Sequence, residues 1–136
     1  MVLEQARSGL TSEAMMTAAL GRIVIYTKKI DQMAEFYSRH FGFSVHRPDG
    51  DRLVELRPRD FGLTILLHPA AAPQAEGQSL IKLVFDIEDV GSFCARSRAN
   101  GLTFGKIHQA DGYVFANARD PSRNPIQISS RAFAQP

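Results

Sequence analysis

The residues of this chain that could act as acids, bases or metal ligands are few and widely spaced. The four histidines are His40, His46, His68 and His108, and no two of them stand two or four positions apart. Two ligands on one strand or one helix face need those spacings, so a local histidine chelate is absent. Cys94 is the single cysteine, which excludes an internal disulfide and a thiolate cluster.

Two kinds of chemistry remain open for these side chains. Glu55, His68 or Tyr113 could perform acid–base catalysis in a pocket without a metal. Alternatively, His46, His68 or Glu55 could converge in space on an unexpected metal site. Both hypotheses depend on the fold, because the residues lie on different predicted strands.

A strand followed by an amphipathic helix begins at Gly21. The β-branched segment "RIVIYT" predicts the strand, and the apolar residues of "IDQMAEFYSRHFGF" recur at i, i+3, i+4, i+7 and i+11, as on one helix face. We expect Asp31 to cap this helix and Gly42 to end it. Three further strands are predicted in "FSVHR", "RLVELR" and "GLTILLH", with "PDGD" as a turn.

The same plan recurs after residues 69–79, whose Ala, Pro, Gln and Gly without periodicity indicate a linker. "LIKLVFDI" predicts a strand, "DVGSFCARSRAN" a helix ended by Gly101, and "LTFGKIH", "GYVFANA" and "NPIQISS" three more strands. We therefore expect an α+β fold of two paired βαβββ modules, at residues 21–68 and 80–130. Residues 1–20 are an expected N-terminal tail with a short helix from Thr11 or Ser12, and residues 131–136 a C-terminal tail.

Strand alternation predicts which side chains face a pocket and which face the helices. On the first strand of each half, every second residue points to the pocket, and on the last strand Gln127 does so. These pocket-facing residues are Arg22, Val24 and Tyr26, and Lys82, Val84 and Asp86. In the hairpin "DGYVFANA", either Tyr113, Phe115 and Asn117 or Val114, Ala116 and Ala118 point to the pocket, and alternation alone does not choose between the two sets.

The two cations at the strand starts have two interpretations. Arg22 and Lys82 could lie at the pocket rim in water, or lie inside and be neutralised by Glu55, Asp86 or an acidic ligand, because an unpaired buried charge is costly. The rim or an ion pair is favoured for both. Tyr26 and Gln127 are neutral and amphipathic, so they are the stronger candidates for ligand contact.

Three of these segments resemble the vicinal oxygen chelate superfamily of glyoxalases, bleomycin-resistance proteins and extradiol dioxygenases. They are the helix in "KKIDQMAEFYSRHFGF", the strand "GLTILLHPA" that closes the first half, and "DPSRNPIQI", similar to the family's Asp-Pro-x-Gly-Asn turn before its last strand. The resemblance runs from Gly21 to Ser130 and implies a cup-shaped, half-open mixed β-barrel with the helices outside, and often a homodimer. Arg123 stands where the family's turn usually has Gly, which puts a positive φ there in doubt.

The resemblance also implies where a divalent metal would be held in metal-dependent members. One ligand comes from the first strand and one from the fourth strand of each half. In this chain Arg22, Lys82 and Gln127 occupy three of these places, and Thr64, Ile65 or Leu66 the remaining one. A guanidinium has no lone pair to donate and an ammonium repels a cation, so we expect no metal and no other cofactor.

The composition excludes several other classes. A formal charge of +2 without a basic cluster gives no support for nucleic-acid or membrane partners, and one cysteine fits the cytoplasm. The expected function is binding of a small planar or aromatic molecule in a metal-free cup; the alternative is a metal-dependent or acid–base lyase, isomerase or dioxygenase of the same superfamily. The candidate ligand contacts are Arg22, Tyr26, Glu55, His68, Lys82, Asp86, Tyr113, Phe115 and Gln127.

Overall fold

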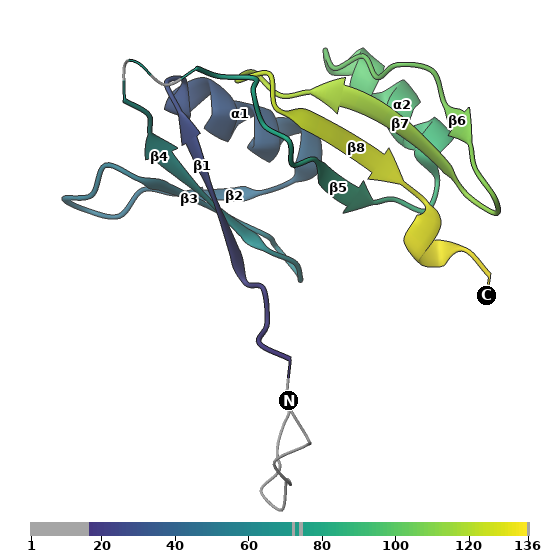
Figure 1. Ribbon diagram of the computed structural model, residues 1–136, viewed down its shortest axis with the longest axis horizontal. Helices are drawn as coiled ribbons and strands as arrows, with labels where there is room; N and C mark the ends of the chain where they lie inside the picture. Colours follow the sequence, from purple (N-terminus) through teal and green to yellow (C-terminus); the bar gives the residue numbers. More distant parts are fainter. Residues whose placement is uncertain (1–16, 72, 74, 136) are drawn as a thin grey trace, which may run out of the picture.

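The computed structural model describes residues 17–71, 73 and 75–135, which form two βαβββ modules side by side (Figure 1). The predicted α+β architecture is confirmed. The first module has β1 (Arg22–Thr27), α1 (Ile30–Phe41), β2 (Ser44–His46), β3 (Val54–Arg57) and β4 (Thr64–Pro69). The second has β5 (Leu83–Asp86), α2 (Val90–Ala99), β6 (His108–Gln109), β7 (Val114–Arg119) and β8 (Pro125–Ser129), followed by a 3₁₀ turn, η1 (Arg131–Phe133).

The helix predicted from Thr11 or Ser12 lies outside the described residues. No helix in the described part of the chain has the length and apolar content needed to cross a membrane.

Each module forms one mixed four-stranded sheet with the same topology. The strand orders are β1-β4-β3-β2 and β5-β8-β7-β6, and the first and last strands of each module run parallel. Val24 aligns with Leu66 in the first sheet, and Val84 aligns with Gln127 in the second. The register therefore makes Leu66 the first-module counterpart of Gln127, a choice that the sequence left open.

Helix α1 ends as expected but begins differently. Its buried side includes Met33 and Tyr37, and Gly42 ends it with φ 77°. The expectation that Asp31 caps the helix is wrong, because Lys29 is the N-cap residue and has no side-chain capping bond. Thr27 Oγ1, at the end of β1, accepts a hydrogen bond from the Lys29 N–H, and the helix begins at Ile30, so Asp31 lies inside the first helical turn.

Helix α2 has a side-chain cap at its start and a glycine just after its end. The Asp89 carboxylate accepts hydrogen bonds from the backbone N–H and the hydroxyl of Ser92, and these bonds lower the pKa of Asp89. Gly101 follows the helix with φ 98°, as predicted. The Leu102 N–H then donates to the Ser97 carbonyl at 2.8 Å, which closes the last turn.

The strand predicted for "LTFGKIH" is wrong for most of its length. Only the two residues of β6 pair with β7. Leu102 and Phe104 are instead buried in the core, and Gly105 makes a single backbone bond to the Asn117 carbonyl. Apolar side chains at alternate positions are typical of a strand. Here they pack beneath α2, but the backbone of this segment does not pair continuously with a neighbouring strand.

One apolar core joins the two modules. The rings of Phe41, on α1, and Phe85, on the helix-facing side of β5, stack with centroids 4.1 Å apart. Tyr37 and Phe43 also contact Phe85, and buried residues of both sheets belong to the same cluster. Because the helix-facing sides of both sheets share this core, the opposite face of each sheet remains open.

A buried polar junction lies beside this core. The Asp120 carboxylate is 4% exposed and accepts hydrogen bonds from the Tyr37 hydroxyl at 2.7 Å and from the Ser122 N–H at 2.9 Å. Asn124 donates to it through its backbone N–H and its side-chain amide. Burial, and then the adjacent Asp120 carboxylate, raise the pKa of Tyr37 strongly, so its hydroxyl keeps its proton and remains a donor.

The turn at Arg123 has the positive φ that is usual for glycine and was in doubt for an arginine. Arg123 has φ 70°, which is the left-handed region that favours glycine. The Arg123 N–H donates to the Asp120 carbonyl, and Asp120 also holds the residues on both sides of Arg123, so the turn imposes this φ.

We expect Arg123→Gly to raise the free energy of unfolding by about 0.5–1 kcal/mol, because glycine removes the left-handed strain at some cost in chain entropy. Urea unfolding of both proteins measures the difference. Arg123→Ala, which retains a Cβ, serves as the control and should give no gain. A loss of stability in the glycine variant would contradict the assigned strain.

Candidate functional site

The open face of the second sheet carries a pocket of about 330 Å³. Strands β5 and β8 supply its floor, Tyr113 lies just before β7, and η1 supplies one wall. Among the predicted contacts, Asp86, Tyr113 and Gln127 line it together. The complete lining is Val84, Asp86, Tyr113, Gln127, Ser129, Arg131 and Ala132.

A chain of polar side chains runs along one end of this face. Asn117 Oδ1 accepts a hydrogen bond from Gln127 Nε2 at 3.0 Å and another from Lys82 Nζ at 3.1 Å. Two predicted contacts, Lys82 and Gln127, are therefore joined through Asn117. The exposed ammonium of Lys82 keeps a positive charge beside the Gln127 amide.

The hairpin presents its aromatic residues, rather than its small ones, on the open side. Ala116 is fully buried on the helix side, so Phe115 and Asn117 point the other way. The rings of Phe115 and His108 stack with centroids 4.9 Å apart, and Tyr113 lies 6.2 Å from Phe115. This second-sheet aromatic group is therefore available to a flat ligand.

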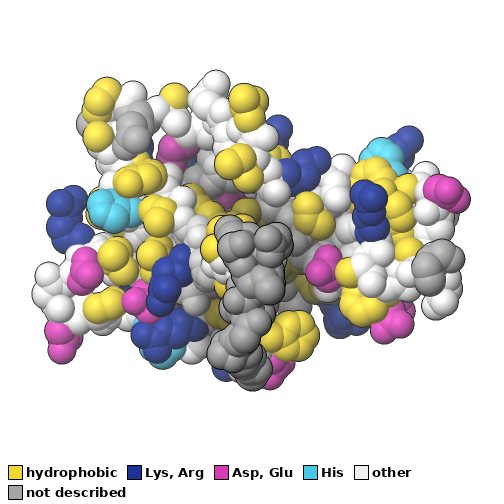
Figure 2. Space-filling view, turned by 60° about the horizontal axis from the view of Figure 1, so that its bottom comes forward, with side chains coloured by type: hydrophobic (Ala, Val, Ile, Leu, Met, Phe, Trp, Pro, Cys, Tyr) yellow, Lys and Arg dark blue, Asp and Glu magenta, His cyan; other side chains and the backbone are white. Residues whose placement is uncertain are grey.

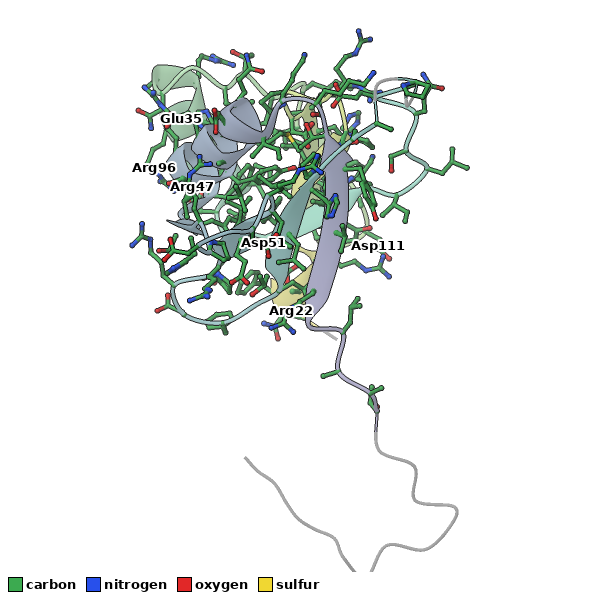
Figure 3. All side chains as sticks on the ribbon, turned by 90° about the vertical axis from the view of Figure 1, so that its left-hand side faces the viewer. Arg22, Glu35, Arg47, Asp51, Arg96 and Asp111 are labelled. Carbon is green, nitrogen blue, oxygen red and sulfur yellow. The ribbon has the colours of Figure 1, made fainter. Side chains whose placement is uncertain are left out.

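The predicted contacts of the first module lie on the other sheet and do not line this pocket. Tyr26 is 54% exposed, and its ring lies 5.1 Å from that of His68 on the neighbouring strand. Glu55 forms an ion pair with Arg57, with 2.7 Å between nitrogen and oxygen. Arg22 is exposed at the start of β1, on the far side of the molecule from Glu35 and Arg96 of the helices (Figure 3).

The residues at the positions where the resemblance implies metal ligands do not suit a divalent cation. These are Arg22, Lys82 and Gln127, to which the strand register adds Leu66 as the counterpart of Gln127, and only the amide of Gln127 has an oxygen to offer. That amide lies beside a lysine ammonium that shares its hydrogen-bond partner. Within the described residues, no group of three or more His, Cys, Asp or Glu is placed to hold a metal elsewhere.

Sequence reasoning missed two side chains of this open face, of which Arg131 lines the pocket. Arg131 was assigned to a C-terminal tail, but η1 places its guanidinium 5.5 Å from the Tyr113 ring centre. For Asn117, alternation did not decide which face of β7 its side chain is on. Its hydrogen bonds with Lys82 and Gln127 depend on the pairing of β7 with β8. A polar residue directly after the last strand, followed by "AF", was the one available signal for η1.

Comparison with known proteins places the chain among proteins of the same fold. It is 22% identical over 114 residues to the uncharacterized protein YetH of Bacillus subtilis, spanning 80% of this chain and 95% of YetH. The crystal structure of UcmS2 superposes with a TM-score of 0.71 at 22% identity, covering 85% of this chain and 99% of UcmS2. TnmS3, an antibiotic binding protein from Streptomyces sp. CB03234, gives 0.69 at 18% identity, covering 84% and 96%.

The family assignment comes from a match to a family model. Residues 19–128 fit the family described as the Glyoxalase/Bleomycin resistance protein/Dioxygenase superfamily, and this range runs from before β1 into β8 and so spans both modules. Fold, register and family match agree, and the chain therefore belongs to the Glyoxalase/Bleomycin resistance protein/Dioxygenase superfamily.

Proposed function

We propose that this protein binds a planar aromatic small molecule on its open sheet faces without a metal ion. The observation that carries the proposal is two solvent-accessible ring contacts, the tilted pair of Tyr26 and His68 on one sheet and the stacked pair of Phe115 and His108 on the other. Aromatic rings on an open face bind flat molecules by stacking, and polar groups beside them fix the orientation. Gln127 and Tyr113 supply such groups on the second sheet.

The proposal includes a homodimer. Apolar side chains remain exposed on and before the edge strands β1 and β5, and hydrophobic groups lie uncovered among charged ones on the face from which the N-terminal segment leaves (Figure 2). A second copy would cover them and close each open face into a cup. The residues concerned are Leu20, Val24, Leu80, Ile81 and Val84. We place this dimer in the cytoplasm.

Binding is favoured over catalysis by the state of the candidate catalytic groups. The Glu55 carboxylate is held by Arg57, and His68 is exposed beside Tyr26. Family membership does not distinguish binding from catalysis, because the description of the family names both enzymes and resistance proteins. The similarity in fold to TnmS3, an antibiotic binding protein, is consistent with a binding role.

The test is calorimetric titration with a panel of planar antibiotics and dyes. We expect Tyr26→Ala and Phe115→Ala each to weaken binding about tenfold, because each removes a stacking surface worth about 1 kcal/mol or more. Addition of a chelator should leave the affinity unchanged. Phe61→Ala is the matched control, because Phe61 is 90% exposed in the loop before β4 and away from the ring stacks.

Two outcomes would contradict the proposal. One is that no planar compound binds at up to millimolar concentration. The other is a stoichiometric divalent ion in protein purified without chelator, which would return the enzyme hypothesis to first place. Sedimentation of the same samples tests the dimer independently.

A further inference from the structure

The pocket on the second sheet holds two opposite charges that do not pair with each other. Asp86, at the end of β5, and Arg131, on η1, both line the pocket, and both are exposed. Among the residues that the structure describes, neither side chain has a salt-bridge or hydrogen-bond partner. Their charged atoms are therefore available to a third molecule.

The construction of the pocket holds the Arg131 side chain in place. The Arg131 N–H donates to Ser129 Oγ at 3.1 Å, and Ser129 is 3% exposed, which anchors η1 to the end of β8. The guanidinium then lies over the Tyr113 ring, where a cation–π contact restrains it and leaves its N–H edge free. Lys82, the other predicted cation of this sheet, donates to Asn117 and does not line the pocket, so Arg131 is the cation of the pocket lining.

The space between the two charges has an apolar lining. Val84 and Ala132 contribute methyl groups and Tyr113 contributes its ring to this half-open pocket of about 330 Å³. This volume lies at the lower end of the range of small-molecule sites. A ligand that fills it meets a carboxylate on the β5 side and a guanidinium on the η1 side.

We infer that this pocket selects a small zwitterion, in which a cationic nitrogen meets Asp86, a carboxylate meets Arg131, and a flat apolar part lies along Tyr113. Each charged group of such a ligand would form a charge-assisted hydrogen bond with a side chain that lacks a partner in the free protein. This inference rests on the proposed function, because it specifies the chemistry of one of its ligand surfaces.

A matched set of indoles separates the charge requirement from the ring requirement. L-tryptophan carries both charges, tryptamine only the cation, indole-3-propionate only the anion, and 3-methylindole neither. Titration of the full chain is expected to show tryptophan bound about 1.5- to fivefold more tightly than each singly charged indole, which is the range for exposed charge pairs. 3-Methylindole should bind most weakly.

Two variants assign the preference to the two side chains. Asp86→Asn should abolish the preference for tryptophan over indole-3-propionate and leave the preference over tryptamine. Arg131→Gln should do the reverse. The controls are Asp111→Asn, an exposed carboxylate outside the pocket, and Arg96→Gln, which removes a similar guanidinium–ring contact with Phe93 on α2. Neither control should change the order of the four indoles.

The outcomes distinguish this inference from the proposed function. Equal binding of all four indoles, or variants that leave the order intact, would overturn the zwitterion inference while planar binding stands. Absence of binding by all four also overturns it, and the panel of larger planar compounds then shows whether the proposed function fails as well.

Discussion

Asp120→Ala is expected to lower the free energy of unfolding by about 3–5 kcal/mol, the range for removing one partner of a buried charged network. The carboxylate accepts four hydrogen bonds, and its loss leaves the Tyr37 hydroxyl and the N–H groups of Ser122 and Asn124 buried without an acceptor. Because Tyr37 belongs to the first module and Asp120 to the second, the substitution also removes a link between the modules. Urea unfolding monitored by circular dichroism measures the change.

Two further variants make this result interpretable. Asp120→Asn retains one oxygen acceptor and should cost roughly half as much. Asp111→Ala removes an exposed aspartate at the opposite end of β7, in the loop between β6 and β7, and should change stability by less than about 0.5 kcal/mol. If Asp120→Ala cost no more than Asp111→Ala, the junction would have no stabilising role.

Phe85→Ala is expected to cost about 2–4 kcal/mol, slightly below the usual cost for a fully buried phenylalanine because Phe85 is only partly buried. The ring stacks on Phe41 and contacts Tyr37 and Phe43, so its removal opens a cavity where the two modules meet. The melting temperature and the urea midpoint should both fall.

Val84→Ala is the matched control for this prediction. Val84 precedes Phe85 on the same strand but points to the open face and is 51% exposed. Its truncation should cost less than about 1 kcal/mol in the isolated chain. Equal losses in the two variants would mean that the two faces of β5 are buried to the same degree, which contradicts the open sheet.

The elements that the sequence predicted well are those in which local and tertiary preferences agree. Helix α1 combines an apolar stripe with a glycine stop, and β1 alternates as expected, so both were located within a residue or two. The segment after Gly101 was wrong because alternation reports burial on one side and does not report whether a partner strand is present. Arg123 was doubtful because hydrogen bonds to Asp120, which override its intrinsic preference, are tertiary information.

The sequence predicted which side chains of the candidate site lie on the open face of each sheet. It did not predict which of them contact one another. Alternation correctly placed Val24 and Tyr26 on the exposed side of β1, and Val84 on that of β5. It could not show that Lys82 and Gln127 meet at Asn117, because that contact depends on cross-strand register. Arg131 escaped because its position depends on a short 3₁₀ turn with no periodicity to detect.

The parallel strand pairs β1–β4 and β5–β8 have equivalent register in the two modules. They carry different side chains at equivalent positions. Where β1 aligns Tyr26 with His68, β5 aligns Asp86 with Ser129. At this register position, a cup assembled from one sheet of each kind would have an aromatic pair on one wall and a carboxylate on the other, even in a dimer of identical chains. A bound molecule would then have a defined head and tail, and its reversed pose would place charge against rings and apolar atoms against carboxylate. The two modules thus share a scaffold and differ on their open faces, which would give the proposed binding site a polarity.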